Sequence, residues 1–306
     1  MSAQDQPWTI RTTLAWTQGH LAQKGDVNPR LSAQWLLCYA TALTRLDLYL
    51  DFDRPLSPAE RATLREAVKR RAAGEPLQYI IGTAPFRHLD LQVRPGVLIP
   101  RPETELLVDL VLTYLDVDKG ELPPPPPGPH NHPLSTGTRC NAQSLLHEHP
   151  QCHVAATDID PQAVGLAQAN AQALKLDGLG RLHIAQDDLA ASLLQGPANH
   201  QAFDVVVSNP PYIPTAQLRT LPQEVAAFEP VLALDGGASG LAIFKRIIDQ
   251  ARVLLRPGGL LACELHEDTV HQAAALCAPG FTNVTAHQDL TGRDRFITAQ
   301  REGMPQ

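Results

Sequence analysis

The chain has 306 residues, of which 43% are hydrophobic and 19% charged, and its formal net charge at pH 7 is −7. This length and composition predict a folded protein of one or two domains and exclude a disordered chain. The negative charge disfavours direct nucleic-acid binding, and no run approaches the roughly 18 apolar residues of a membrane span. The N-terminus lacks a signal-sequence pattern and the five cysteines are scattered, so we expect a cytoplasmic protein.

The first part of the chain is predicted to be helical. Residues 30–50 carry apolar side chains at mixed three- and four-residue intervals, which is the pattern of one helix face. A second helix is predicted after Ser57, which can form a capping box with Glu60, and Pro58 suits its first turn. We therefore expect a small N-terminal helical domain over residues 1–75.

From residue 76 onwards the pattern changes to β-branched and apolar residues interrupted by Gly and Pro. This predicts a β-hairpin and a linker over residues 76–100, followed by a helix with Pro102 in its first turn. Beyond residue 150, strands alternate with helices. The fold expected over residues 101–306 is therefore α/β, a doubly wound, mostly parallel, Rossmann-like sheet with sites at the carboxyl ends of its strands.

The segment FDVVVSNPPYIP carries the strongest chemical signal. An apolar strand ends in Asn209, Pro210, Pro211 and Tyr212, and the two prolines make the loop stiff. The Asn209 side-chain carbonyl and the Pro210 main-chain carbonyl can both accept hydrogen bonds from one planar NH₂ group, and Tyr212 can stack on its face. Such a loop can hold an amide or amine nitrogen for attack on an electrophile. The alternative is a rigid loop without chemistry.

Asp158 ends the predicted strand HVAATD. A carboxylate at the end of the second strand of a nucleotide-binding fold accepts hydrogen bonds from ribose hydroxyls. The competing role is a helix cap, for which Asp160, followed by Pro161, is better placed. We therefore expect Asp158 to bind a ribose.

Several motifs are spread over nearly the whole chain: RRAAGEPLQYIIG, PGVLIPRPETE, ATDIDPQAVGLAQANA, FDVVVSNPPYIP, FEPVLALDGGASGL, RPGGLL and GRDRF. Together they resemble the release-factor glutamine methyltransferase family. Asn-Pro-Pro-Tyr alone is shared with DNA adenine methyltransferases and with several RNA and protein methyltransferases, whereas PRPETE and the helical first domain narrow the match. The resemblance implies an enzyme that uses S-adenosylmethionine to methylate the glutamine side-chain nitrogen in the Gly-Gly-Gln loop of peptide chain release factors. It also implies that the first domain recognises this substrate.

The resemblance also implies roles for single residues. Asn209, Pro210 and Tyr212 match the catalytic part of a clamp for the substrate amide, and Pro211 completes it. Arg101 and Glu103 match a family motif near the site. The residues expected to bind the cofactor are Ser135, Thr136, Gly137, Thr138, Arg139, Asp158 for the ribose, Leu189 beside the adenine, and Asn209.

One family motif, Asp-Leu-Gly-Thr-Gly-Ser-Gly or similar, is altered in this chain. The corresponding residues, counted back without gaps from Asp158, are Pro133, Leu134, Ser135, Thr136, Gly137, Thr138 and Arg139. Only one of three glycines remains, although a backbone that passes against the cofactor needs glycine in its turns. Residues 130–133, His-Asn-His-Pro, stand where a central strand is required and predict no strand. The proline-rich residues before about Pro129 predict a linker.

Three explanations of this segment stay open: a remodelled cofactor loop, a loss of cofactor binding, or a locally displaced reading frame. Arg139-Cys140-Asn141 can be encoded CGG-TGC-AAT, which one base later reads Gly-Ala and the start of an Ile codon, as is common in the family. The functional alternatives are accordingly methylation of adenine or another protein amide by the same clamp, and a release-factor-binding protein that lacks the cofactor.

Histidines and cysteines are crowded between residues 130 and 153. Their spacing fits no regular Cys/His zinc pattern. His147 and His149, two residues apart on a predicted helix, face different ways. We therefore expect no metal site.

Overall fold

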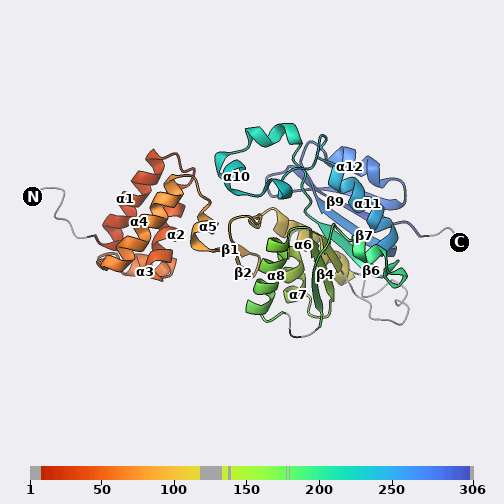
Figure 1. Cartoon of the computed structure of the whole chain (residues 1–306), viewed down its shortest axis with the longest axis horizontal. Coiled ribbons are helices and arrows are strands. Elements are labelled where there is room, and N and C mark those ends of the chain that lie inside the picture. The colour runs from red at the N-terminus through yellow and green to blue at the C-terminus, as the bar shows by residue number, and fades with distance from the viewer. Residues whose placement is uncertain (1–7, 118–132, 137–138, 177, 179, 304–306) are drawn as a thin grey trace, which may run out of the picture. The chain divides into compact units, whose positions relative to one another are not determined.

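The computed structural model describes residues 8–117, 133–136, 139–176, 178 and 180–303 of the chain (Figure 1). The chain divides into two compact units. The first consists of Met1–Thr83, Val93–Pro95 and Pro222–Phe228, and the second of Ala84–Gln92, Gly96–Leu221 and Glu229–Gln306.

The first unit is helical and is drawn mainly in red and orange in Figure 1. Its helices are α1 (Ile10–Gln23), α2 (Pro29–Thr41), α3 (Arg45–Leu50), α4 (Pro58–Ala72), α5 (Leu77–Ile81) and α10 (Gln223–Phe228). The apolar sides of α1 to α5 bury a common core that includes Ile10, Leu21, Leu36, Leu37, Leu48, Leu64 and Val68.

The start of α4 is as the sequence predicts. The Glu60 main-chain N–H donates to the Ser57 hydroxyl at 3.2 Å, and the Ser57 N–H donates to the Glu60 carboxylate at 2.7 Å. Pro58 lies in the first turn. The predicted capping box is thus confirmed. The sequence could predict it because all of its partners are within three residues of each other.

Residues 30–50 are helical, as predicted, and form two helices, because Ala42 takes a left-handed conformation with φ 56° and Thr44 caps a new helix through a capping box with Asp47. The start of the predicted hairpin and linker over residues 76–100 differs from the expectation. Leu77–Ile81 is a helical turn, although its β-branched residues favour a strand. The two-stranded sheet of β1 (Thr83–Phe86) and β2 (Leu89–Gln92) follows it.

A buried arginine joins distant segments of the first unit. Arg71 on α4 is 8% exposed. Its guanidinium contacts Asp26 at 2.7 Å and Glu224, on α10, at 2.9 Å. Because a buried charge must be paired, this pair of contacts holds α10, from late in the sequence, within the N-terminal helical unit.

The second unit is built on one mixed sheet. Among the described residues, seven strands pair in the order β5-β4-β3-β6-β7-β9-β8. The four pairs from β5 to β7 are parallel, and the last two pairs are antiparallel. The strands are β3 (Pro133–Thr136), β4 (Val154–Asp158), β5 (Leu182–Gln186), β6 (Phe203–Ser208), β7 (Leu255–Glu264), β8 (Phe281–Gln288) and β9 (Asp294–Arg301). The predicted doubly wound, mostly parallel α/β fold is confirmed.

The helices of this unit lie on both sides of the sheet. They are α6 (Thr104–Val117), α7 (Arg139–Glu148), α8 (Pro161–Ala173), α9 (Ala191–Leu194), α11 (Ala242–Leu254) and α12 (Val270–Cys277). Short 3-10 turns lie at Pro197–Asn199, Thr215–Thr220 and Val231–Ala233. Helix α6 begins at Thr104, so Pro102 precedes the helix and does not lie in its first turn as expected.

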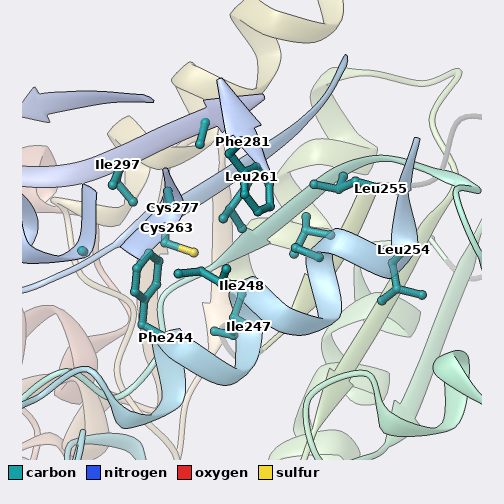
Figure 2. Close-up of a cluster of buried hydrophobic side chains, with 14 of the residues drawn as sticks. Phe244, Ile247, Ile248, Leu254, Leu255, Leu261, Cys263, Cys277, Phe281 and Ile297 are labelled. Atoms are coloured by element: carbon teal, nitrogen blue, oxygen red, sulfur yellow. The ribbon is translucent and has the colours of Figure 1, made fainter. Parts of the chain in front are cut away.

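Alternate residues of the central strands face opposite cores. Val205 and Val207 of β6 belong to the cluster under α6 and α7, whereas Val206 belongs to the cluster under α11 and α12. Figure 2 shows residues of the second cluster, among them Phe244 of α11 and Leu261 of β7. This period of two follows from the pleat of the strand, and burial on both faces explains why the strand is apolar throughout.

The strand β3 corrects an expectation from the sequence. Residues 130–133 predicted no strand, yet Pro133–Thr136 pairs with β4 on one side and β6 on the other. Pro133 is the first residue of the strand, which is where a missing N–H is tolerated. Residues 130–132 lie outside the described part of the chain.

The burial of the core predicts that two leucines differ greatly in their contribution to the free energy of unfolding. Leu261 is fully buried and Leu290 is 91% exposed. Leu261→Ala should lower the free energy of unfolding by about 3 kcal/mol, because it leaves a cavity between α11 and the sheet. Leu290→Ala, the matched control, should change it by less than about 0.5 kcal/mol. Urea unfolding of the full chain measures both, and equal midpoints would contradict this packing.

Candidate active site

The Asn-Pro-Pro-Tyr loop follows the buried strand β6 at its carboxyl end. Asn209 is 8% exposed, Pro210 is buried, and Pro211 and Tyr212 are half-buried. The Asn209 carboxamide nitrogen donates to the hydroxyl of Thr104, the first residue of α6, at 3.0 Å. Residues 105 positions apart in the sequence thus meet at this loop.

A buried carboxylate completes this network. Glu264, the last residue of β7, is 2% exposed. One of its oxygens accepts from the Thr104 hydroxyl at 2.6 Å, and the other accepts from the Tyr212 hydroxyl at 3.1 Å. Hydrogen bonds therefore run from Asn209 through Thr104 and Glu264 to Tyr212, which joins both ends of the loop to α6 and β7.

The ionisation of this network is shifted by its burial. Burial raises the pKa of Glu264 to about 7, although the hydrogen bonds from Thr104 and Tyr212 and the charge of Arg295 act in the opposite direction. Burial and the adjacent Glu264 carboxylate raise the pKa of the Tyr212 phenol, so it remains a donor at neutral pH.

The backbone of the loop is supported by the segment DGGASGL. The Ile213 N–H donates to the Leu234 carbonyl at 3.0 Å, and the Gly236 N–H donates to the Ile213 carbonyl at 2.8 Å. At Gly240, φ is +72°, and a Cβ atom there would come within 2.4 Å of the Tyr212 carbonyl oxygen. Only glycine permits this close approach of the two backbones.

Thr136, Asp158 and Asn209, three of the residues expected to bind the cofactor, lie at the same edge of the sheet. Thr136 of β3 pairs with Thr157 of β4 on one side and with Ser208 of β6 on the other. Asp158 and Asn209 are the next residues on the outer strands, about 10 Å apart at the usual strand spacing. Strand order reverses between β3 and β6, which makes this edge the switch point where ligands bind in such folds.

Asp158 and Leu189 are tied to each other through β4. Asp160 caps α8 by accepting from the Gln162 N–H at 2.9 Å, as expected. One Asp158 carboxylate oxygen accepts from the Asp160 N–H at 2.8 Å. Leu189, with φ 58°, accepts from the Thr157 hydroxyl through its carbonyl. Asp158 at the end of β4 and Leu189 beyond the end of β5 thus lie at neighbouring strands of the sheet.

The altered glycine motif takes a different local structure from the loop expected. Ser135 and Thr136 lie in β3, and Arg139 is the first residue of α7. Gly137 and Thr138, which connect the two, lie outside the described residues. In folds of this class a nucleotide binds beside the N-terminus of the helix that follows such a strand, because the N–H groups of that helix end point towards the ligand.

The structure also adds residues that the sequence analysis did not single out. Thr104 and Glu264 are central to the network, and only their position inside PRPETE and ACELHE could have marked them. Arg101 donates to Glu229, which is 5% exposed, at 2.6 Å. Glu103 is exposed and takes no part in the hydrogen bonds of the network.

The described part of the chain holds no group of three or more His, Cys, Asp or Glu residues placed to bind a metal ion. It also contains no helix with the length and apolarity needed to cross a membrane.

Comparison with known proteins defines the class and then the family. Residues 134–226 match the methyltransferase small domain, and residues 12–82 match the PrmC N-terminal domain. The catalytic domain of hMettl16 is similar in fold, with a TM-score of 0.52 and 16% identity over 78% of this chain and 82% of that one. The second unit therefore has the fold of a methyltransferase domain.

Relatives named release factor glutamine methyltransferase match nearly the full length. The protein from Geobacter sulfurreducens is 40% identical over 97% of this chain and 98% of its own. The protein from Moorella thermoacetica is 40% identical over 96% of this chain and 99% of its own. The chain belongs to the release factor glutamine methyltransferase family.

The buried carboxylate predicts how stability depends on pH. Because the pKa of Glu264 rises from 4.5 to about 7 on folding, the folded protein binds more protons than the unfolded chain within this window. The contribution of Glu264 to stability is therefore lost as pH rises through the window. The free energy of unfolding of Glu264→Gln, compared with that of the wild type at the same pH, should therefore increase by on the order of 2 kcal/mol from about pH 5 to about pH 8. Urea unfolding at both pH values measures this difference, and a constant difference would contradict the raised pKa.

Proposed function

We propose that residues 209–212 hold the side-chain amide of the glutamine that this family methylates, which lies in the Gly-Gly-Gln loop of a peptide chain release factor. The observation that supports this role is the hydrogen bond from the Asn209 carboxamide nitrogen to Thr104. It uses the donor side of the carboxamide, so that the Asn209 oxygen is left as the acceptor for a substrate N–H.

The clamp acts on a nitrogen that is a poor nucleophile, because its lone pair is delocalised into the amide. The Asn209 Oδ1 and the Pro210 carbonyl accept the two N–H groups of the substrate, and the ring of Tyr212 lies on its face. Two fixed acceptors orient the nitrogen and stabilise positive charge as it develops there. The rigid prolines and the anchored Tyr212 hydroxyl keep this geometry in place before substrate binds.

S-adenosylmethionine, when bound, supplies the methyl group, whose bond to sulfur breaks as its bond to the glutamine nitrogen forms. Asp158 would accept the ribose hydroxyls, and Leu189 would lie beside the adenine. Ser135, Thr136, Gly137, Thr138 and Arg139 would form the wall of the site with their backbone. The methylated nitrogen can lose its extra proton to water, so the clamp itself needs no general base.

The first unit is proposed to recognise the release factor. Its match to the PrmC N-terminal domain supports this role. The net charge of −7 suits a folded protein substrate better than a nucleic acid duplex. Methylation of adenine and a cofactor-deficient binding protein are the alternatives, and the full-length relatives favour glutamine methylation over both.

Calorimetry tests the proposed cofactor site. We expect micromolar binding of S-adenosylmethionine by the wild type, and an absence of binding would support the cofactor-deficient alternative. Asp158→Asn keeps the acceptor for the Asp160 N–H but removes the charge, and should weaken binding about tenfold or more. Asp160→Asn, the matched control, preserves the cap of α8 and should leave the affinity unchanged. Equal affinities of the two variants would contradict the ribose role.

Asn209→Ala tests the clamp. It should abolish methyl transfer to purified release factor and spare S-adenosylmethionine binding, because the residue holds the acceptor amide. Asn199→Ala, which changes the same residue type near the other end of β6, should retain activity. The measurement is transfer of labelled methyl groups to release factor, with DNA and RNA as competing substrates. Near-normal turnover by Asn209→Ala would rule out the proposed role.

A further inference from the structure

The network behind the clamp contains two polar side chains that the proposed reaction does not use. Thr104 and Glu264 are both buried, with exposures of 0% and 2%. The Thr104 hydroxyl donates to Glu264 at 2.6 Å and accepts from the Asn209 carboxamide at 3.0 Å, so Glu264 is connected to Asn209 through Thr104. Buried polar groups of this kind are costly unless each donor is paired with an acceptor. The pairing therefore determines how each side chain of the network is oriented.

Counting donors and acceptors fixes the direction of every hydrogen bond. An ionised carboxylate only accepts, so the single hydroxyl proton of Thr104 is directed to Glu264. The Thr104 oxygen can then only accept from Asn209, which must turn its NH₂ group towards Thr104. The Asn209 oxygen must consequently face the other way. A carboxamide is nearly symmetric in shape, and its hydrogen bonds alone decide which end points where.

We propose that Thr104 and Glu264 are positioning residues that fix the orientation of the Asn209 carboxamide, so that its oxygen faces the substrate. This inference rests on the proposed role of Asn209 as the substrate clamp. The charge of Glu264 is essential to it. A protonated Glu264 can donate to Thr104, which releases the hydroxyl proton of Thr104 and allows Asn209 to present either end.

Charged and polar groups on several neighbouring elements surround Glu264 and affect its pKa. Arg295 of β9 lowers the pKa of Glu264 and Glu103, just before α6, raises it, while the donors Thr104 and Tyr212 lower it. Further out, the ring of His266 lies 6.3 Å from that of Tyr212, and Arg101 is paired with Glu229. With a pKa of about 7, Glu264 changes charge within the range accessible to an activity assay.

The pH dependence of Glu264→Gln is the main test. In the wild type, kcat/KM should fall on the acid side of about pH 7 as Glu264 is protonated, because kcat/KM reports ionisations of the free enzyme. Glu264→Gln should lack this acid limb and have a kcat/KM about tenfold lower at alkaline pH, which is the scale of one lost hydrogen-bond constraint. Its affinity for S-adenosylmethionine should equal that of the wild type. An unchanged acid limb, or an unchanged alkaline rate, would overturn the proposal.

A matched pair at Thr104 separates positioning from packing. Thr104→Val keeps the shape but removes the hydroxyl through which Glu264 acts on Asn209, so it should lower kcat/KM and abolish the acid limb. Thr104→Ser retains the hydroxyl and should recover the wild-type midpoint and most of the rate. Identical pH profiles of the two variants would contradict the proposal, and this pair decides the question if Glu264→Gln fails to fold.

Different results would contradict the clamp at Asn209 and the positioning role of Thr104 and Glu264. If Asn209→Ala remains active, the clamp itself is wrong. If Asn209→Ala is inactive but the acid limb is indifferent to both Glu264→Gln and the Thr104 pair, the clamp stands and only the positioning role is overturned.

Discussion

A carboxylate that is 2% exposed must either accept hydrogen bonds or become protonated. The arrangement of the site depends on the hydrogen bonds that the Glu264 carboxylate accepts. Its donors come from Thr104, 160 residues earlier in the chain, and from Tyr212, 52 residues earlier. Supplying them requires that α6 begin beside the end of β7 and that the loop after β6 turn back over it. The position of the Asn-Pro-Pro-Tyr loop is therefore coupled to the hydrogen bonding of one buried acid.

The order of the strands explains how two ligands can meet at this edge. With β3 between β4 and β6, Asp158 and Asn209 lie on either side of one strand. Strand pairing uses backbone groups, so β3 can keep its place although its sequence departs from the family pattern. Pro133 is compatible because it begins the strand. What the altered residues must preserve is an extended backbone followed directly by a helix, and Thr136 and Arg139 stand at those two points.

The features that could be predicted from the sequence are those whose cause is local. The capping box at Ser57 and the cap at Asp160 involve partners within three residues. The fold and the strand before Asn209 follow from apolar patterning. The features that were missed depend on distant partners or on burial. Ala42 breaks a helix in a left-handed conformation without a glycine, and β8, an edge strand with exposed polar residues, lacks a clear apolar pattern. Thr104 and Glu264 have no local signal, because each acquires its role only through the other.

Stability and positioning are opposed at Glu264. An uncharged residue of the same shape would avoid the cost of burying a carboxylate at neutral pH, but it could donate as well as accept, and the direction of the hydrogen bonds would no longer be determined. A carboxylate in direct contact with Asn209 would set the direction too, but it would bring a negative charge next to the incoming amide. Because the neutral Thr104 hydroxyl lies between them, Glu264 determines the direction of the hydrogen bond from Asn209 without placing a charge beside it. Two donors and the nearby Arg295 counter the charge of Glu264, and the proposed clamp would present only neutral acceptors to its substrate. A network with this division of tasks is expected where an orientation must be held firmly and the held group must stay neutral.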